Sequence, residues 1–135
     1  MADISITAAN VTTTSTATRT GTAGASITAG QVLYVDSADS NKLKLADTSS
    51  GAKATAVGIA LHAAASGQPI TYQTSGNITI GATVAVGVPY FVSDTAGGLR
   101  PLADAGTGDY ATLMGVGVST SVININIVQT GAQVA

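Results

Sequence analysis

The sequence predicts an all-β protein, and three observations support this. First, the composition favours strands and tight turns: β-branched Thr and Val are abundant, sixteen Gly punctuate the chain, and every acidic residue is Asp. Asp is unfavourable inside helices and suits turns, because its short carboxylate bonds nearby backbone N–H groups. Second, several segments alternate apolar and polar residues, as half-buried strands do. Third, the chain contains an internal repeat of strand-like segments.

The repeat has a spacing of 57 residues (111 minus 54). Residues 54–61 are Ala-Thr-Ala-Val-Gly-Ile-Ala-Leu, and residues 111–118 are Ala-Thr-Leu-Met-Gly-Val-Gly-Val. The flanking segments correspond in the same register, namely 33–36 with 90–93 and 45–47 with 102–104. Each copy alone, at about 50 residues, would be marginally stable. We therefore expect the two copies to share one core or to borrow core from a neighbouring subunit.

The predicted architecture is a compact β-barrel or sandwich-like body made from two copies of a β-hairpin-rich unit. A single β domain is expected over residues 27–135, with the repeat units at 27–76 and 80–131. The 135 residues are enough for one such domain. Aromatic residues make up 4% of the chain, so the core is expected to consist of small aliphatic side chains.

Residues 1–26 precede the repeat and are predicted to form an extended N-terminal arm. The serial Thr residues of 10–21 favour extended backbone, but few large apolar side chains are present to anchor them. One interpretation is a flexible or surface strand. The other is an arm that orders by adding a strand to a partner or to a sibling subunit. The candidate contact residues of this arm are Ile4, Ile6, Val11, Thr13 and Arg19.

In the first copy, alternation and apolar runs define four strands. The strands are expected at 31–35, 42–45, 56–61 and 69–73. Residues 42–45 alternate Lys and Leu, whereas 56–61 are nearly all apolar, which is typical of a strand buried on both faces. Residues 36–41 form a polar turn, and 62–68 form a connector with room for one helical turn.

In the second copy, strands are expected at 77–80, 84–92, 99–102, 113–118 and 122–128. Pro89 marks a bend, because proline lacks the N–H that a central strand requires. Residues 113–118 form the second buried strand, and 122–128 alternate Ile with Asn, so that the polar face of this strand carries amides. Gly58 and Gly115 occupy the same point of the two copies. Glycine inside a buried strand marks a bulge or a close backbone approach, so both are predicted to be structural.

Charge and composition exclude several function classes. The net charge is −2 and the five basic residues are scattered, which argues against nucleic-acid binding. No apolar run approaches the roughly 20 residues of a transmembrane helix, and no secretory signal is expected. The absence of Cys excludes disulfides and Cys-built zinc sites. Charged residues are 9% of the chain, a low fraction that favours a surface partly covered by partners.

The sequence predicts no catalytic, cofactor or metal site, and therefore no enzyme and no small-molecule substrate. His62 is the only His, and its counterpart in the second copy is Ser119, so it is expected to be structural or solvated. The Asp residues fall at turns without EF-hand spacing, which excludes a dedicated calcium loop. Lys42 follows a hairpin turn as the modified Lys of a biotinyl carrier does, but the flanking residues of such carriers are missing. The glycines match neither phosphate-binding template.

The first copy resembles the small head decoration, or capsid cement, proteins of tailed bacteriophages. The resemblance is carried by Ala-Gly-Gln-Val-Leu-Tyr-Val at 29–35, Val-Gly-Ile-Ala-Leu at 57–61 and Ala-Ala-Ala-Ser-Gly-Gln-Pro-Ile at 63–70. It extends over 29–76, with 80–131 as a diverged second copy, and does not include the N-terminal arm. It implies a homotrimer on the outer face of an icosahedral capsid.

This resemblance implies a structural virion protein, made in the host cytoplasm, that binds the major capsid protein and stabilises the shell by clamping neighbouring subunits. The alternative is a β-rich adhesion or carbohydrate-binding module of a surface fibre. Sugar-binding sites usually present exposed aromatic rings, whereas the chain has only four Tyr and one Phe, of which Tyr34, Tyr90 and Phe91 fall in strands predicted to be buried.

Overall fold

The computed structural model describes residues 3–102 and 108–133, and over this part the chain is all-β, as predicted. Two 3-10 turns, η1 (Ala8–Asn10) and η2 (Ser37–Asp39), accompany the strands. The strands are β1 (Val11–Thr12), β2 (Thr18–Thr22), β3 (Val32–Asp36), β4 (Lys42–Leu45), β5 (Ala56–Ala60), β6 (Pro69–Gln73), β7 (Gly76–Ile80), β8 (Pro89–Val92), β9 (Leu99–Pro101), β10 (Tyr110–Gly117) and β11 (Val122–Gln133). No helix within the described residues is long and apolar enough to cross a membrane.

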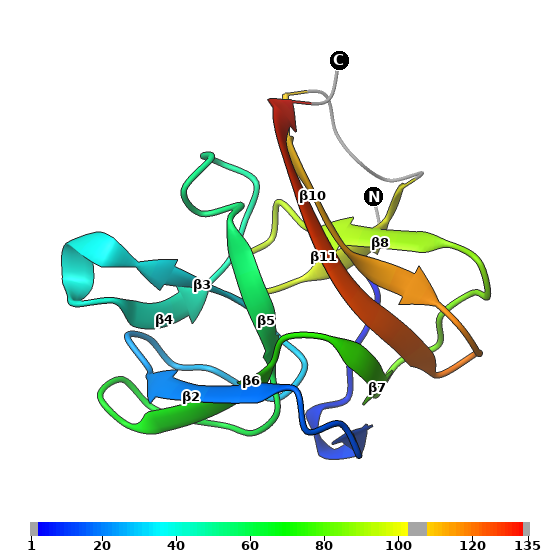
Figure 1. Ribbon diagram of the computed structural model, residues 1–135, viewed down its shortest axis with the longest axis horizontal. Coiled ribbons are helices and arrows are strands. Elements are labelled where there is room, and N and C mark those ends of the chain that lie inside the picture. The colour runs from blue at the N-terminus through cyan, green and yellow to red at the C-terminus, as the bar shows by residue number, and fades with distance from the viewer. Residues whose placement is uncertain (1–2, 103–107, 134–135) are drawn as a thin grey trace.

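The strands form two antiparallel sheets that lie next to each other in Figure 1. The five-stranded sheet has the order β2-β6-β5-β3-β4, and the six-stranded sheet has the order β1-β7-β11-β10-β8-β9. Strands β3 to β6 come from the first predicted copy, and β8 to β11 from the second. Each copy therefore supplies most of one sheet.

The two strand orders correspond position by position. Hairpin β3–β4 matches hairpin β8–β9, β5 matches β10, and β6 matches β11. At the next position β2 pairs with β6, just as β7 pairs with β11. The strand β2 lies within the predicted arm, yet it is an integral strand of the five-stranded sheet. The boundary predicted at residue 26 thus separates β2 from the sheet to which it belongs.

The five-stranded sheet curls into a half-barrel with its own core. Its two edges approach at Ala23 and Leu43, which form a parallel bridge, and Gly24 N donates to Leu43 O at 2.8 Å. A set of buried side chains from this sheet and its loops fills the curl. They are Ala23, Ile27, Leu33, Leu43, Ala60, Ala64, Ile70 and Tyr72.

The larger core lies where the two sheets meet, because both sheets contribute to it. From the five-stranded sheet come Val32, Tyr34, Ala56 and Ile59, and from the six-stranded sheet Ile78, Ile80, Tyr90, Val92, Leu99, Met114, Ile123 and Ile125. Strand β5 contributes side chains to both cores, since Ile59 packs in the larger core and Ala60 in the core of the curl. This agrees with the prediction that 56–61 are buried on both faces. The matching prediction for 113–118 is wrong at its end, because Val118 lies beyond β10 and is 47% exposed.

Glycines at the bulges allow the central strands to approach their neighbours. The β3–β5 register shifts between Leu33 and Tyr34, opposite Gly58, and a Cβ on Gly58 would overlap the backbone carbonyl of Gln73. In β10 the register shifts next to Gly115, where a Cβ would overlap the backbone carbonyl of Asn124. A bulge adds one residue on one strand and re-aims the side chains that follow it. The two glycines therefore occupy matching bulges in the two sheets.

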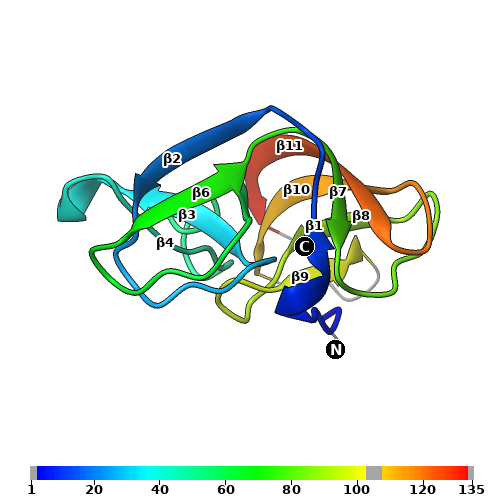
Figure 2. The same cartoon turned by 90° about the horizontal axis from the view of Figure 1, so that it is seen from below.

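The N-terminal segment is extended, but it is not a projecting arm. Ile4 N donates to Leu99 O at 2.9 Å and Thr7 N donates to Gly81 O at 2.8 Å, after which β1 pairs with β7 and β2 with β6. Figure 2 shows this segment passing from the six-stranded sheet to the five-stranded one. The segment therefore hydrogen-bonds to both sheets and ties them together.

Three smaller expectations also change. Residues 4–6, whose Ile-Ser-Ile alternation predicts a short strand, carry a hydrogen bond to β9 but are not a strand. Of residues 84–92, only Pro89–Val92 are strand, and the connector 62–68 contains turns rather than a helical turn. Of the repeat correspondence, positions 103 and 104 lie outside the described residues.

Candidate binding surfaces

The apolar residues predicted as arm contacts face the chain's own core. Val11 is 9% exposed and belongs to the larger core, and Ile4 and Ile6 are partly buried against it. Their contact with a partner stays a prediction, but these side chains do not lie on a free arm, because Val11 is buried and Ile4 and Ile6 are partly covered within the chain. The physical reason is that the segment has a better-matched partner in the edges of its own sheets than in solvent.

The remaining two arm residues differ from each other. Thr13 Oγ1 donates to Asn77 O at 3.1 Å and accepts from Ser15 N at 3.0 Å, so its hydroxyl serves the turn between β1 and β2. Arg19 lies in β2 with an exposed side chain. Within residues 3–102 and 108–133, no carboxylate forms an ion pair with Arg19, whereas Lys42, Lys44 and Arg100 are each paired. Arg19 is thus the predicted contact residue whose functional group remains available.

A groove of about 360 Å³ lies beside Arg19, at the open end of the curled sheet. Its walls come from both sheets, and most of its side chains are aliphatic or aromatic. The principal lining residues are Arg19, Val35, Val57, Tyr72, Thr74 and Ile127. Val35 and Val57 pack at the margin of the curl's core, and Ile127 at the margin of the larger core. The groove is therefore apolar with a single cation at its border.

A second surface is uncharged and rich in hydroxyl and amide groups. It follows β1, β7 and the start of β11, where two hollows of about 280 and 390 Å³ share Thr79. The first is lined by Thr12, Thr13, Thr14, Asn77, Thr79 and Val122, and the second by Ser5, Thr7, Asn10, Thr83 and Ser121 among others. On the same strands Asn124 Nδ2 donates to Asn77 Oδ1 at 2.8 Å. We call this the hydroxyl–amide face.

His62 has a structural role. Its Nε2 accepts a hydrogen bond from Thr71 N at 3.0 Å, and its Nδ1 lies 2.9 Å from Ala63 O. An imidazole that accepts at Nε2 carries its proton on Nδ1, which then donates to the carbonyl. Both nitrogens are thus engaged by backbone that leads into β6. Within the described residues no group of three or more potential metal ligands comes together.

The charged turn between β3 and β4 is also built for structure. Lys44 Nζ lies 2.9 Å from Asp36 and 3.1 Å from Asp39, and Lys42 Nζ lies 3.7 Å from Asp39. Hydrogen bonding from Lys44 lowers the pKa of both Asp36 and Asp39, and hydrogen bonding to Asp36 raises the pKa of Lys44. Lys42 is thus part of an ion-pair network around a turn in which Ser40 and Asn41 adopt positive φ.

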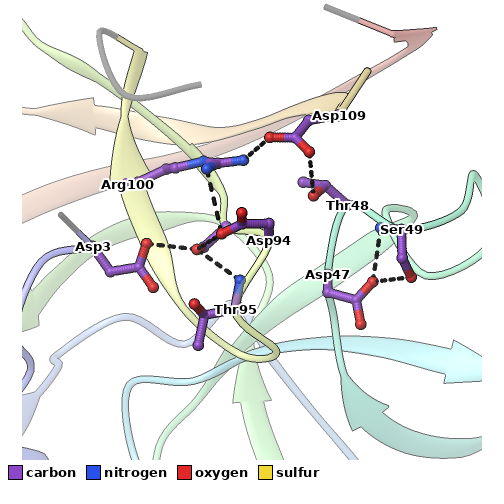
Figure 3. Close-up of polar contacts among 9 residues, drawn as sticks. Asp3, Asp47, Thr48, Ser49, Asp94, Thr95, Arg100 and Asp109 are labelled. Carbon is purple, nitrogen blue, oxygen red and sulfur yellow. Dashed lines mark hydrogen bonds and ion pairs between the residues drawn. The ribbon is translucent and has the colours of Figure 1, made fainter. Parts of the chain in front are cut away.

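The feature that the sequence analysis missed is a buried arginine at the junction of the sheets (Figure 3). Arg100 in β9 is 2% exposed and forms ion pairs with Asp109 and, at 3.4 Å, with Asp94. Asp109 in turn accepts from Thr48 Oγ1 at 3.1 Å, which links the six-stranded sheet to the loop before β5. Nearby, Ser93 Oγ donates to Asp3 at 2.5 Å and holds the N-terminal segment.

This cluster holds loops together. A buried arginine requires charged partners, because an unpaired buried charge costs several kcal/mol. The local sequence Leu-Arg-Pro gave no signal of burial, since an alternating strand places Arg outside by default. Arg100 lies beside Thr48, in the loop before β5, and Asp109, just before β10, and both lie outside β9 in the sequence.

The chain matches no protein-family model, no curated protein and no solved structure.

Proposed function

We propose that this protein is a non-enzymatic structural protein of a virion. It decorates the outer surface of an icosahedral phage capsid, binds the major capsid protein and clamps neighbouring subunits. The observation that supports this most directly is the hydroxyl–amide face, an uncharged, hydrogen-bonding surface to which the strands contribute Thr12, Asn77 and Thr79. Strand-borne side chains are held in place before binding, which reduces the entropy lost on association.

The rigidity of the body suits a clamp. The N-terminal segment bonds to both sheets, and the Arg100 cluster joins β9 to the loop at Thr48 and the segment before β10. A clamp resists shell opening only if it does not itself deform, so internal cross-links of this kind support the proposal.

The surface area is sufficient for such attachment. A specific interface buries roughly 800 Å² on each partner, which is about one eighth of this chain's 6158 Å². A ligand that binds only the assembled shell stabilises it by about 2.7 kcal/mol per site at 100 times Kd. A trimer would add avidity through effective concentration. A trimer of this 13.1 kDa chain has a mass of about 39 kDa (3 × 13.1) in sedimentation equilibrium.

The proposal includes an internal duplication. The shared strand order of the two sheets supports it, together with the 57-residue sequence correspondence and the matching glycines Gly58 and Gly115. In this proposal each unit begins at the strand that pairs with β6 or β11, namely β2 or β7, so the first copy starts about ten residues before residue 27.

The alternative, a carbohydrate-binding module, is less well supported by the aromatic residues. Tyr34, Tyr72 and Tyr90 are 7%, 7% and 4% exposed, so their rings are not available to stack on sugars. Phe91 and Tyr110 are half-buried beside Arg100. No specific observation favours the sugar-binding function.

The test uses the purified protein and bare expanded shells of the major capsid protein encoded in the same genome. Co-sedimentation is expected to saturate at a fixed copy number, and the melting temperature of the shells is expected to rise. Absence of saturable binding would refute the proposed function, and selective binding on a glycan array would favour the alternative.

A further inference from the structure

The alternation of side chains along β2 fixes the direction in which the Arg19 side chain points. Side chains alternate along a strand, so Arg19 and Gly21 of β2 point to the same face. A Cβ on Gly21 would lie 2.6 Å from Leu43 Cδ2, which places this face inside the curl. The Thr18, Thr20 and Thr22 side chains consequently point outward, whereas Arg19 points toward the groove.

Among residues 3–102 and 108–133, the side chains around Arg19 offer its charge no carboxylate partner. Its cross-strand neighbour is Tyr72, whose ring belongs to the core of the curl. Thr74 Oγ1 already donates to Ala17 O at 3.1 Å, and the remaining walls, including Val35 and Val57, are aliphatic. The groove thus combines one guanidinium with an apolar floor, in a chain whose net charge is −2.

We propose that this groove is a docking site for a surface segment of a partner protein that presents a carboxylate flanked by aliphatic side chains. The guanidinium matches a carboxylate in a bidentate geometry, and the aliphatic flanks cover Val35, Val57 and Ile127. Because the chain as a whole is negative, Arg19 supplies the local complementarity that gives an acidic segment its register.

A protein segment is the occupant that fits the shape. Small-molecule sites typically enclose 70–90% of their ligand. This groove has walls from two sheets and an exposed arginine at its border, so a ligand would be covered on one side. A segment held by the rest of a protein interface does not need enclosure. In the proposed function the partner is the capsid subunit, and in that respect the inference rests on that proposal.

The deciding experiment does not need the capsid. The probe is a blocked peptide, acetyl-Gly-Val-Asp-Val-Gly-amide, titrated into the isotope-labelled full chain, with the Asn analogue as its matched control. Saturable methyl shifts are expected at Val35, Val57 and Ile127 with the Asp peptide. The Asn peptide, or the variant Arg19→Gln, is expected to weaken binding by roughly tenfold or more, the effect of losing charge-assisted hydrogen bonds. Absence of saturable shifts, or equal affinity for both peptides, overturns the inference.

The shell-binding assay then separates this inference from the proposed function. Arg19→Gln is expected to weaken attachment to shells by roughly tenfold, whereas Lys53→Gln, which removes an equal charge outside the groove, should leave it unchanged. Equal binding by wild type and Arg19→Gln overturns the inference while the proposed function stands. No binding by wild type refutes the proposed function, and the peptide titration still decides whether the groove takes a carboxylate. Because Arg19 is exposed, equal melting temperatures for variant and wild type are the control for folding.

Discussion

Replacing Gly115 with Ala adds a single methyl group, yet it should destabilise the protein strongly. The new Cβ would overlap the backbone carbonyl oxygen of Asn124 and would lie 2.9 Å from both the carbonyl carbon of Asn124 and Ile123 Cγ2. The carbonyl belongs to the paired strand β11, so it cannot rotate away as a side chain can. Overpacking of a core typically costs about 1–3 kcal/mol, and contact with fixed backbone places this variant at the upper end.

The expected effect is a loss of about 3 kcal/mol in the free energy of unfolding, or roughly 10 °C in melting temperature for a chain of this size. Differential scanning calorimetry and urea titration measure both quantities. The matched control is Gly51→Ala, where the Cβ would meet only Tyr110 Cε1 at 3.7 Å. Gly51→Ala should be neutral or slightly stabilising, since alanine lowers the entropy of the unfolded chain. Melting of Gly115→Ala within 2 °C of that control (about 0.5 kcal/mol) would refute the close approach of β10 and β11.

Three further predictions follow from the packing and the charges. Arg100→Met should lower the free energy of unfolding by about 3 kcal/mol, because it leaves the Asp109 carboxylate without its cation, whereas Asp94→Asn, at a 63% exposed side chain, should change the urea midpoint little. Deleting residues 1–12 should abolish cooperative thermal unfolding, because it removes β1 and the Ile4, Ile6 and Val11 side chains. The burial of these side chains stabilises the fold by about 4–6 kcal/mol. A truncated chain that melts like the full chain would contradict the packing of this segment. The pKa values of Asp36 and Asp39 lie below their ordinary values, so the two carboxylates stabilise the β3–β4 turn at neutral pH. This stabilisation should be lost as the pH falls below 3.8 through the folded-state pKa values. Amide exchange at Ser40 and Asn41 should report the loss, and Lys44→Gln should remove this pH dependence.

Local pattern predicted most of the strands. Periods of two and short apolar runs located β3 to β6 and β10 to β11, because the alternation of side chains across a sheet is a property of the strand itself. The strand β2 was not assigned from the pattern. Its Thr-Arg-Thr-Gly-Thr sequence carries no apolar face, and what defines it is the available edge of β6.

The pairing of the N-terminal segment, like that of β2, is set by an available sheet edge and not by its local sequence pattern. A threonine-rich segment with two Ile and one Val has the same sequence whether it pairs with its own chain or with a partner. The sequence predicts an arm separate from the body only because it does not show that Ile80 and Leu99 lie beside these side chains. Long-range pairing of this kind depends on which edge is open in the folded chain.

The sequence by itself determined that this chain forms strands, that its segments recur every 57 residues and that Gly58 and Gly115 mark equivalent points. Only the tertiary structure decided that Arg100 is buried, that Arg19 is exposed and unpaired among the described residues, and that the N-terminal segment ties the two sheets together. The physical reason is range. Strand formation follows from neighbours one or two residues apart, whereas the burial of a charge depends on which loops, distant in sequence, come to cover it.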